Sequence, residues 1–590
     1  MAELWNDIVY TDVMQSDGYV VDYAILTTYS LDMPSLLAVP FTLGTMSDLS
    51  EAAFRSPHLI LEAVNRVADK FVVFYNAGCI TVPQNHSKLY TLLERSVAQV
   101  ALPAKGAGFI NFHPKVWVIK ESNPDSGESQ IKVVVLSRNL TNSNDIDVVC
   151  ELVGKIGSEE SSADARAKHT PLIDFLESLS EYGSKDIAKK IHTIVNDIRK
   201  VERFDLGDSP FSDYNFFPMG INRYDGFKQC LKSKILDGAG DMVVISPFID
   251  MATMEMISGN KSKSRRTLIT RHSSINNKVL ELFPDNVYAP KEVLTDSVEK
   301  DVVVDLHEKV YFVHNNRGNH LFLGSTNATQ NGFGRNVEFL MQLTFSSHQI
   351  SYDSFRKELI HDGKDCIFEK VDAVPDDNTC KEDNSDELCL RRVIAAICEA
   401  KIEENDGVYT ITVSCNDSKM PSDKKILIYP LGCPNFRQTL NGRGVVFDQV
   451  ALNQLTEFYV ICVGDLERVV KIKSVNMPIE ARDQAIFHSI INTKSKFINY
   501  IAFMLAENAE QYIAESQYLE KELSKGNSAT IEQEISISLY EDMVRIAYAD
   551  PGRIASIRSI VEKAHESVIP TGFQKMYDTF VKSLVNIKRL

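Results

Sequence analysis

One pair of short motifs occurs twice in this chain of 590 residues. His113-Pro114-Lys115 is followed by Ser137-Arg138-Asn139, and His307-Glu308-Lys309 is followed by Ser325-Thr326-Asn327. Each motif stands beside a hydrophobic run of strand-like composition. A single His-x-Lys in a chain of this length is expected by chance, but two with matching partners indicate an internal duplication.

The segments around the two motifs follow one pattern. An apolar strand that ends in Asp is predicted over residues 23–32 and again over 242–250; in each copy a middle strand and then the His-x-Lys strand follow. Strands alternating with helical patterns predict an α/β sheet covered by helices. Since residues i and i+2 of a strand face the same side, we expect each His and its Lys to project together from mid-strand.

The rest of the chain predicts further units. If the two copies pack about a pseudo-two-fold axis, their motifs face one another. The predicted units are a first half over 1–157, a helical connector over 158–215, a second half over 216–350, an acidic linker and helix over 351–395, a small β domain over 396–478 and a helical C-terminal domain over 479–590.

Composition restricts the location and the partners. The chain is 44% hydrophobic and 24% charged, which is typical of a soluble protein. A net charge of −17 argues against an extended basic surface for duplex DNA, but a small basic cleft is compatible with it. Ten cysteines without zinc-site spacing, no signal peptide and no apolar run of about 18 residues predict a cytoplasmic protein without a membrane span.

The residue types of the paired motif suit phosphodiester chemistry. Two lysines (Lys115, Lys309) and two asparagines (Asn139, Asn327) offset negative charge in a transition state, and Ser137 and Ser325 are expected to bind substrate. A neutral histidine attacks phosphorus, and a second, protonated histidine protonates the leaving oxygen and then activates water. His113 and His307 supply this pair. The scheme uses no metal and no cofactor.

The paired motif resembles the phospholipase D superfamily, whose members place two H-x-K motifs across a pseudo-dimer. The second copy is the better match, with the run from Gly324 to Asn327 and then Asn336-Val337-Glu338. In the first copy Leu136 replaces the leading glycine. Lys120 and His314 stand where the family has an aspartate, so the motif is H-K-N, similar to tyrosyl-DNA phosphodiesterases and bacterial nuclease-like members. The resemblance covers about residues 20–346.

The resemblance implies a pseudo-dimer of two phospholipase D-like mixed-sheet α/β halves, followed by the small β and α-helical domains. It also implies a metal-independent phosphodiesterase, a nuclease acting on DNA or RNA through a phosphohistidine on His113, with His307 as the acid. Acidic residues orient the histidines in the family, and Glu338 and Glu151 suit that role here. Bacterial relatives of this kind resemble components of antiviral defence.

Two other functions stay open at this point. One is a phospholipid phosphodiesterase, and the other is a non-catalytic subunit whose C-terminal domains bind a protein partner. A basic run near the second copy either guides a nucleic-acid backbone or is a solvated loop; it comprises Lys261, Lys263, Arg265, Arg266 and Arg271. The sequence decides neither the substrate class nor the oligomeric state.

Overall fold

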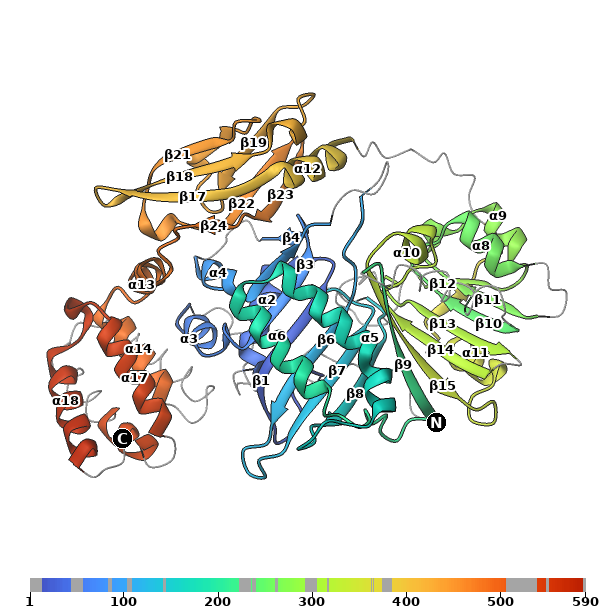
Figure 1. The fold of residues 1–590 in the computed structure, drawn as a ribbon, viewed down its shortest axis with the longest axis horizontal. Coiled ribbons are helices and arrows are strands. Elements are labelled where there is room, and N and C mark those ends of the chain that lie inside the picture. Colours follow the sequence, from blue (N-terminus) through green and yellow to red (C-terminus); the bar gives the residue numbers. More distant parts are fainter. Residues whose placement is uncertain are drawn as a thin grey trace.

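The computed structural model is a mixed α/β protein whose described residues form four sheets (Figure 1). The mixed α/β class predicted from the sequence is therefore confirmed. The structure describes residues 13–43, 57–82, 88–102, 109–141, 145–221, 235, 240–259, 264–291, 305–315, 318–361, 363, 366–373, 385–505, 539–547 and 551–586.

The first sheet contains three parallel strands followed by three antiparallel ones. Its spatial order is β5-β3-β1-β6-β7-β8, with β1, β3 and β5 parallel and β6, β7 and β8 added antiparallel. Every residue of the interior strand β3 is buried, as expected for a strand covered on both faces. The strands are β1 (Val20–Thr28), β3 (Phe71–Asn76), β5 (Val97–Val100), β6 (Val116–Ser122), β7 (Ser129–Leu136) and β8 (Val149–Lys155).

The second sheet repeats this arrangement and adds a strand at each edge. Its order is β16-β12-β11-β10-β13-β14-β15-β9, in which β12-β11-β10-β13-β14-β15 matches the first sheet in order and direction. The strands are β9 (Phe211–Met219), β10 (Asp241–Ile245), β11 (Arg266–Ile269), β12 (Val287–Pro290), β13 (Val310–Asn315), β14 (Gly318–Gly324), β15 (Glu338–Phe345) and β16 (Phe368–Lys370).

Helices α5 (Ala163–Leu179) and α6 (Lys185–Ile198) lie across the first sheet (Figure 1). Ser162 and Ser184 cap their N-termini by accepting backbone N–H groups. One buried apolar cluster contains residues of both helices and of both sheets, among them Leu172, Ile191, Val133, Phe216 and Phe339. The two sheets therefore share one core.

Other helices cover the remaining faces. The first sheet packs against α2 (Met33–Leu43), α3 (Pro57–Val67) and α4 (Leu89–Leu92). The second packs against α8 (Met251–Ser258), α9 (Asn277–Leu282) and α10 (Gln330–Gly334), and α11 (Tyr352–Leu359) joins the shared core.

One edge strand crosses the boundary predicted for the second half, and another lies outside it. β9 begins within the segment predicted as a connector, and β16 lies within the segment predicted as a linker, where it pairs with β12. Two of the three residues of β16 are exposed, so it shows no hydrophobic alternation that a sequence pattern could reveal. The domain boundaries stay predictions.

The small β region after α12 (Ser385–Ala396) is bonded to the first half. One sheet has the order β21-β18-β17-β24, built from β17 (Ile397–Asn405), β18 (Val408–Cys415), β21 (Val445–Val450) and β24 (Ser474–Val475). The other contains β19 (Ile426–Pro430), β20 (Gln438–Thr439), β22 (Phe458–Val463) and β23 (Leu466–Lys471). β23 pairs with β4 (Ile80–Thr81), which pairs with β2 (Leu31–Asp32). The main chain of the first half thus extends this sheet.

The C-terminal helices share a core with the first half. These are α13 (Ile479–Ile490), α14 (Lys494–Leu505), α17 (Pro551–Lys563) and α18 (Thr571–Asn586). Ile486, Phe487 and Ile501 belong to the same buried cluster as Leu61 and Val64 of α3. Within the described part of the chain, no helix is both long and apolar enough to cross a membrane.

A buried ion pair ties three parts of the chain together. Arg482 of α13 lies 2.5 Å from Glu94, with only 4% and 3% of the two side chains exposed. The same carboxylate accepts the hydroxyl of Thr456 and the backbone N–H of Glu457. Removing one partner of such a pair leaves an uncompensated buried charge.

We expect Arg482→Met to lower the free energy of unfolding by about 3–5 kcal/mol, since Glu94 would be left buried and unpaired. The solvent-exposed pair Arg558–Glu562 provides a matched control, and Arg558→Met should cost less than about 1 kcal/mol. Urea unfolding followed by circular dichroism measures both. Equal costs for the two variants would contradict the structural role of the buried pair.

Candidate active site

The two His-x-Lys motifs lie in extended segments that lead into β6 and β13, and not in mid-strand as predicted. β6 begins at Val116 and β13 at Val310, one residue after the lysine of each motif. The reason is that the histidine backbones bond to the other half and not to a neighbouring strand. His113 N donates to the carbonyl oxygen of Val337, and His307 N donates to that of Ile146, both at 2.9 Å.

These bonds belong to two matching parallel bridges between the halves. Phe112 pairs with Val337 in one bridge, and Ile146 pairs with Leu306 in the other. The residue after Val337 is Glu338, and the residue after Ile146 is Asp147. Each bridge therefore brings a carboxylate of one half beside the histidine of the other.

Glu338 holds His113 from the second half. Nδ1 of His113 lies 2.9 Å from Oε2 of the fully buried Glu338 carboxylate. Ser325 Oγ donates to the same oxygen, and Asn336 Nδ2 donates to Oε1 at 3.2 Å. With a carboxylate as its acceptor, Nδ1 of neutral His113 carries the proton, which leaves the lone pair on Nε2 available for chemistry.

Asp147 has the equivalent place in the first half, and the sequence prediction missed it. Ser137 Oγ donates to Asp147 Oδ1 and accepts the N–H of Val148, both at 2.9 Å. In the second half, Ser325 Oγ likewise donates to Glu338 and accepts the N–H of the residue after it, at 2.9 Å. The two serine–carboxylate pairs are therefore structural counterparts.

The sequence signal for Asp147 was present but short. Asp145-Ile146-Asp147 stands before an apolar strand, as Asn336-Val337-Glu338 does. Glu151, the second acid predicted to orient a histidine, does not have that role, because it lies on β8 and pairs with Lys132 at 3.6 Å. His307 Nδ1 lies 3.9 Å from Asp147 Oδ1, a looser contact than that of His113, since aspartate is one methylene shorter than glutamate.

The roles predicted for Ser137 and Ser325 need correction. Both residues are fully buried, and both hydroxyls are occupied by a carboxylate and a backbone N–H. They orient Asp147 and Glu338, and do not face a substrate. The sequence could not show this, because it does not decide whether the side chain of a serine at a strand end points toward solvent or toward the neighbouring strand.

Both motif lysines are buried in the same centre. Lys115 is 0% and Lys309 is 1% exposed. Lys115 Nζ donates to the carbonyl oxygen of His113 at 3.0 Å, and Lys309 Nζ donates to that of His307. Lys309 Nζ also lies 3.5 Å from the carbonyl oxygen of Ser137, so it reaches across to the other half. Burial, with mutual repulsion for Lys115, lowers the pKa of both lysines.

The histidines are held in their neutral form. Burial, followed by the charges of Lys309, Lys115 and Arg271, lowers the pKa of His307 to about 2. Burial also lowers the pKa of His113, but Glu338 opposes that shift. Burial and the neighbouring cations therefore disfavour protonation of either histidine. An anion bound between the histidines would reverse this balance.

Three other polar side chains lie near the centre. Asn139 Oδ1 accepts the backbone N–H of Tyr29 at 3.3 Å, and the Tyr29 ring lies 5.1 Å from that of His113. Asn327 Oδ1 is buried without a hydrogen-bond partner among the described residues. Arg271 Nε lies 2.8 Å from Asp305 Oδ1 and donates to the carbonyl oxygen before His307.

Arg271 is the member of the predicted basic run that reaches the site. Its guanidinium lies 4.5 Å from the ring centroid of Phe248, and its charge acts on His307. Arg265 instead pairs with Asp241 and Asp353 at the surface. Lys261 and Lys263 lie outside the described residues. Among the described members of the run, Arg271 therefore reaches the site and Arg265 lies at the surface.

The centre thus contains two neutral imidazoles, two buried lysine amines of lowered pKa, a guanidinium and two carboxylates. Such a set stabilises an anion that accepts several charged hydrogen bonds. The described residues include no group of three or more His, Cys, Asp or Glu side chains arranged to hold a metal ion.

We expect the centre to bind sulfate with uptake of protons. An anion raises the lowered pKa values of Lys115, Lys309 and His307, so these groups gain protons on binding and affinity falls as pH rises. Lys309→Met should weaken binding about tenfold or more, whereas exposed Lys155→Met should not. Calorimetry in two buffers of different ionisation enthalpy measures the uptake. Binding that strengthens with rising pH would contradict this account of the site.

No family model and no curated protein matches this chain. Three solved structures are similar to parts of it. Polyphosphate kinase from Porphyromonas gingivalis is 14% identical over 59% of this chain and 43% of its own, with a TM-score of 0.31. NucT from Helicobacter pylori is 18% identical over 25% of this chain and 95% of its own, with a TM-score of 0.20. Phosphatidylserine synthase from Haemophilus influenzae Rd KW20 is 12% identical over 60% and 83%, with a TM-score of 0.32.

The TM-scores are low, so the roles of individual residues rest on the geometry of this chain. The chain spans less than half of the polyphosphate kinase that it matches. The resemblance to the phospholipase D superfamily therefore rests on the paired His-x-Lys motifs of the sequence.

Proposed function

We propose that this chain is a metal-independent phosphodiesterase that cleaves nucleic acid, and that its two sheets are the halves of a phospholipase D-like pseudo-dimer. One observation carries the proposal. His113 and His307 each sit beside a carboxylate of the other half, around a shared pair of buried lysines. Double displacement at phosphorus requires this combination of nucleophile, acid and charge stabilisation.

In the proposed first step, Nε2 of His113 attacks phosphorus while His307 protonates the leaving oxygen. A P–N bond forms, the P–O bond breaks, and the electron pair of that bond takes the proton. Lys115 and Lys309 stabilise the non-bridging oxygens, and Asn139 and Asn327 donate from their amides. In the second step neutral His307 takes a proton from water, whose oxygen displaces His113 from phosphorus.

The protonation of His307 depends on the substrate. With its pKa lowered to about 2, His307 is neutral in the free protein at physiological pH. A phosphodiester brings negative charge beside it, and Asp147 lies 3.9 Å from its Nδ1, so substrate binding raises its affinity for a proton. Binding and activation of the acid are therefore coupled.

The surroundings of the site favour nucleic acid as the substrate. Phe248 is 48% exposed and stands beside Arg271, which suits stacking of a base next to a bound phosphate. The other large exposed hydrophobic residues described belong to α12, β21 and the C-terminal helices. A lipid surface would require a larger apolar patch around the site.

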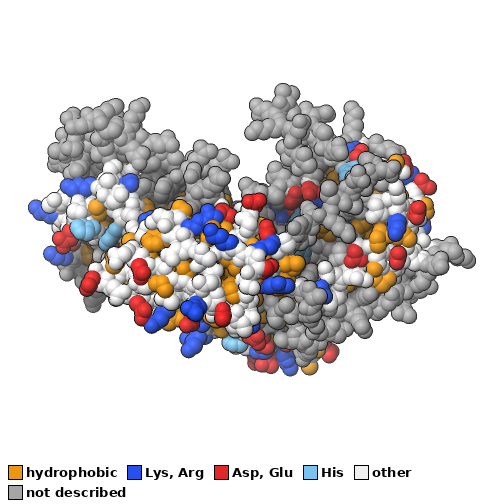
Figure 2. All heavy atoms as spheres, turned by 90° about the horizontal axis from the view of Figure 1, so that it is seen from above, with side chains coloured by type: hydrophobic (Ala, Val, Ile, Leu, Met, Phe, Trp, Pro, Cys, Tyr) orange, Lys and Arg blue, Asp and Glu red, His pale blue; other side chains and the backbone are white. Residues whose placement is uncertain are grey.

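The positive charge of this protein is local. Basic and acidic side chains are interspersed on the described part of the face in Figure 2, so no continuous basic stripe lies there. This agrees with the net charge of −17 and with a short stretch of substrate bound at the site. We also propose a cytoplasmic location, because the cysteines described are free thiols. A role in bacterial antiviral defence, and a protein partner for the C-terminal domains, are proposals that rest on the family resemblance and on the appended domains.

We expect the purified protein to cleave labelled single- or double-stranded DNA or RNA in excess EDTA. His113→Ala and His307→Ala should each reduce the rate about 10³-fold or more, because nucleophile and acid act as a unit. Exposed His348→Ala, in the loop after β15, is the matched control and should retain activity. Gel-resolved initial rates measure all four proteins.

Cleavage that EDTA abolishes would contradict the mechanism. Hydrolysis of phospholipid vesicles without cleavage of any nucleic acid would show that the substrate is a phospholipid and not a nucleic acid. Activity that survives both histidine substitutions would show that the paired motif has a structural role and no catalytic one.

A further inference from the structure

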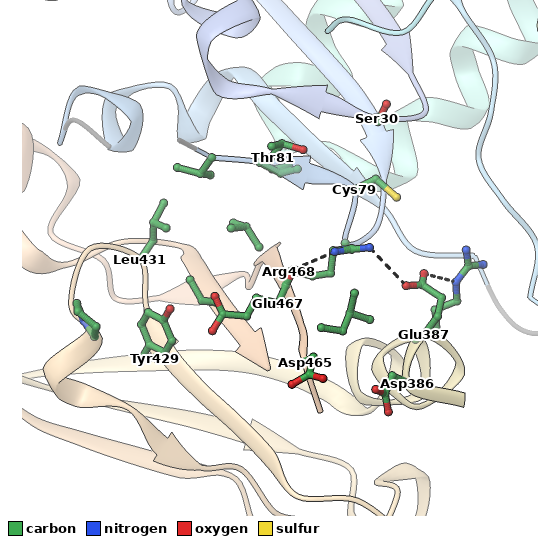
Figure 3. A pocket seen from close by; sticks show the side chains of 18 of the residues that line it. Ser30, Cys79, Thr81, Asp386, Glu387, Tyr429, Leu431, Asp465, Glu467 and Arg468 are labelled. Carbon is green, nitrogen blue, oxygen red and sulfur yellow. Dashed lines mark hydrogen bonds and ion pairs between the residues drawn. The ribbon is translucent and has the colours of Figure 1, made fainter. Parts of the chain in front are cut away.

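A cavity of about 1220 Å³ lies between the first half and the small β region (Figure 3). Glu387 of α12 and Arg468 of β23 both line it and form an ion pair with each other, 3.9 Å apart. The wall from the first half includes Tyr29, whose ring also contacts that of His113. The cavity therefore adjoins the candidate active site.

Arg391 connects this cavity to the active site. Its Nε donates to Glu387 Oε1 at 3.2 Å on the same helix, and its NH1 donates to Asn111 Oδ1 at 2.8 Å. The guanidinium also lies 5.5 Å from the ring centroid of Phe109. Only 21% of the side chain is exposed, so α12 holds Arg391 in one position against the segment before His113.

Asn111 continues the chain of contacts to the carboxylate of the site. Its backbone N–H donates to Asn336 Oδ1 at 3.4 Å, and its carbonyl oxygen accepts the N–H of Val337 at 2.9 Å. Asn336 Nδ2 in turn donates to Glu338 Oε1 at 3.2 Å. Asn111 thus fixes both the main chain and the side chain next to Glu338.

We propose that Arg391 is a positioning residue: by holding Asn111, it fixes Asn336 and Glu338 and thereby sets the orientation of His113. Its effect on turnover rests on the proposed function, but its effect on His113 does not. The contacts run from α12, which packs against the small β region, to His113. Helix α12 therefore completes the active site without touching the substrate.

The proton affinity of His113 reports this positioning. Burial, Lys115 and Lys309 lower the pKa of His113, and Glu338 raises it. His307 and the Tyr29 ring also face the imidazole. If Glu338 is no longer held, its opposing effect weakens, and the pKa of His113 falls further.

Arg391→Met is the test, because methionine keeps an apolar stem near Phe109 and removes both hydrogen bonds. Diethyl pyrocarbonate modification of His113, read by mass spectrometry across pH, gives its titration midpoint without turnover. We expect a lower midpoint in Arg391→Met and a kcat reduced about 3- to 30-fold, with a smaller change in KM. Arg391→Lys, which keeps the charge and one donor, should fall between this variant and the wild type.

Arg468→Met is the matched control. Arg468 lines the same cavity and faces the same Glu387, but it contacts Glu387 and the carbonyl oxygen of Glu467 and not Asn111. It should leave the midpoint and kcat unchanged, with all variants melting at the wild-type temperature. A wild-type midpoint in Arg391→Met, or an equal shift in Arg468→Met, would overturn the proposal. If the wild type hydrolyses no phosphodiester, the proposed function fails while the midpoints still decide this inference.

Discussion

The active-site arrangement depends on two reciprocal backbone bridges between the halves. Phe112 pairs with Val337, and Ile146 pairs with Leu306. Each bridge places a histidine of one half beside a carboxylate of the other, so neither half alone has a complete His–acid pair. Because the two sheets also share one apolar core, this geometry is rigid in the way that a preorganised site requires.

The sequence predicted what is local to the motifs. The i, i+2 spacing predicted that each lysine would accompany its histidine, and the N-x-E run predicted Glu338 near a histidine. Local spacing could not predict that His113 and His307 leave the strand pattern, because their N–H groups bond to segments far away in sequence. Asp147 was missed for the same reason: its partner His307 belongs to the other half.

Long-range contacts account for the other differences. Arg391 contacts Asn111, which is 280 residues away in sequence. Arg271 belongs to a basic run in the sequence, and only the tertiary structure shows that it differs from the other described members by reaching the site. The apolar strands of both halves were predicted well, because buried strands have a strong signal. Most residues of the edge strand β16 are exposed, so the strand can be identified only from its pairing with β12.

Trapping the covalent intermediate tests the central claim most directly. A p-nitrophenyl nucleotide ester needs no acid for its leaving group, so His307→Ala should still form the adduct but lack the base that activates water to remove it. After an alkaline quench, tandem mass spectrometry should then locate a nucleotidyl phosphoramidate on His113. An adduct on His307 in the wild type, or no adduct on any histidine, would contradict the account.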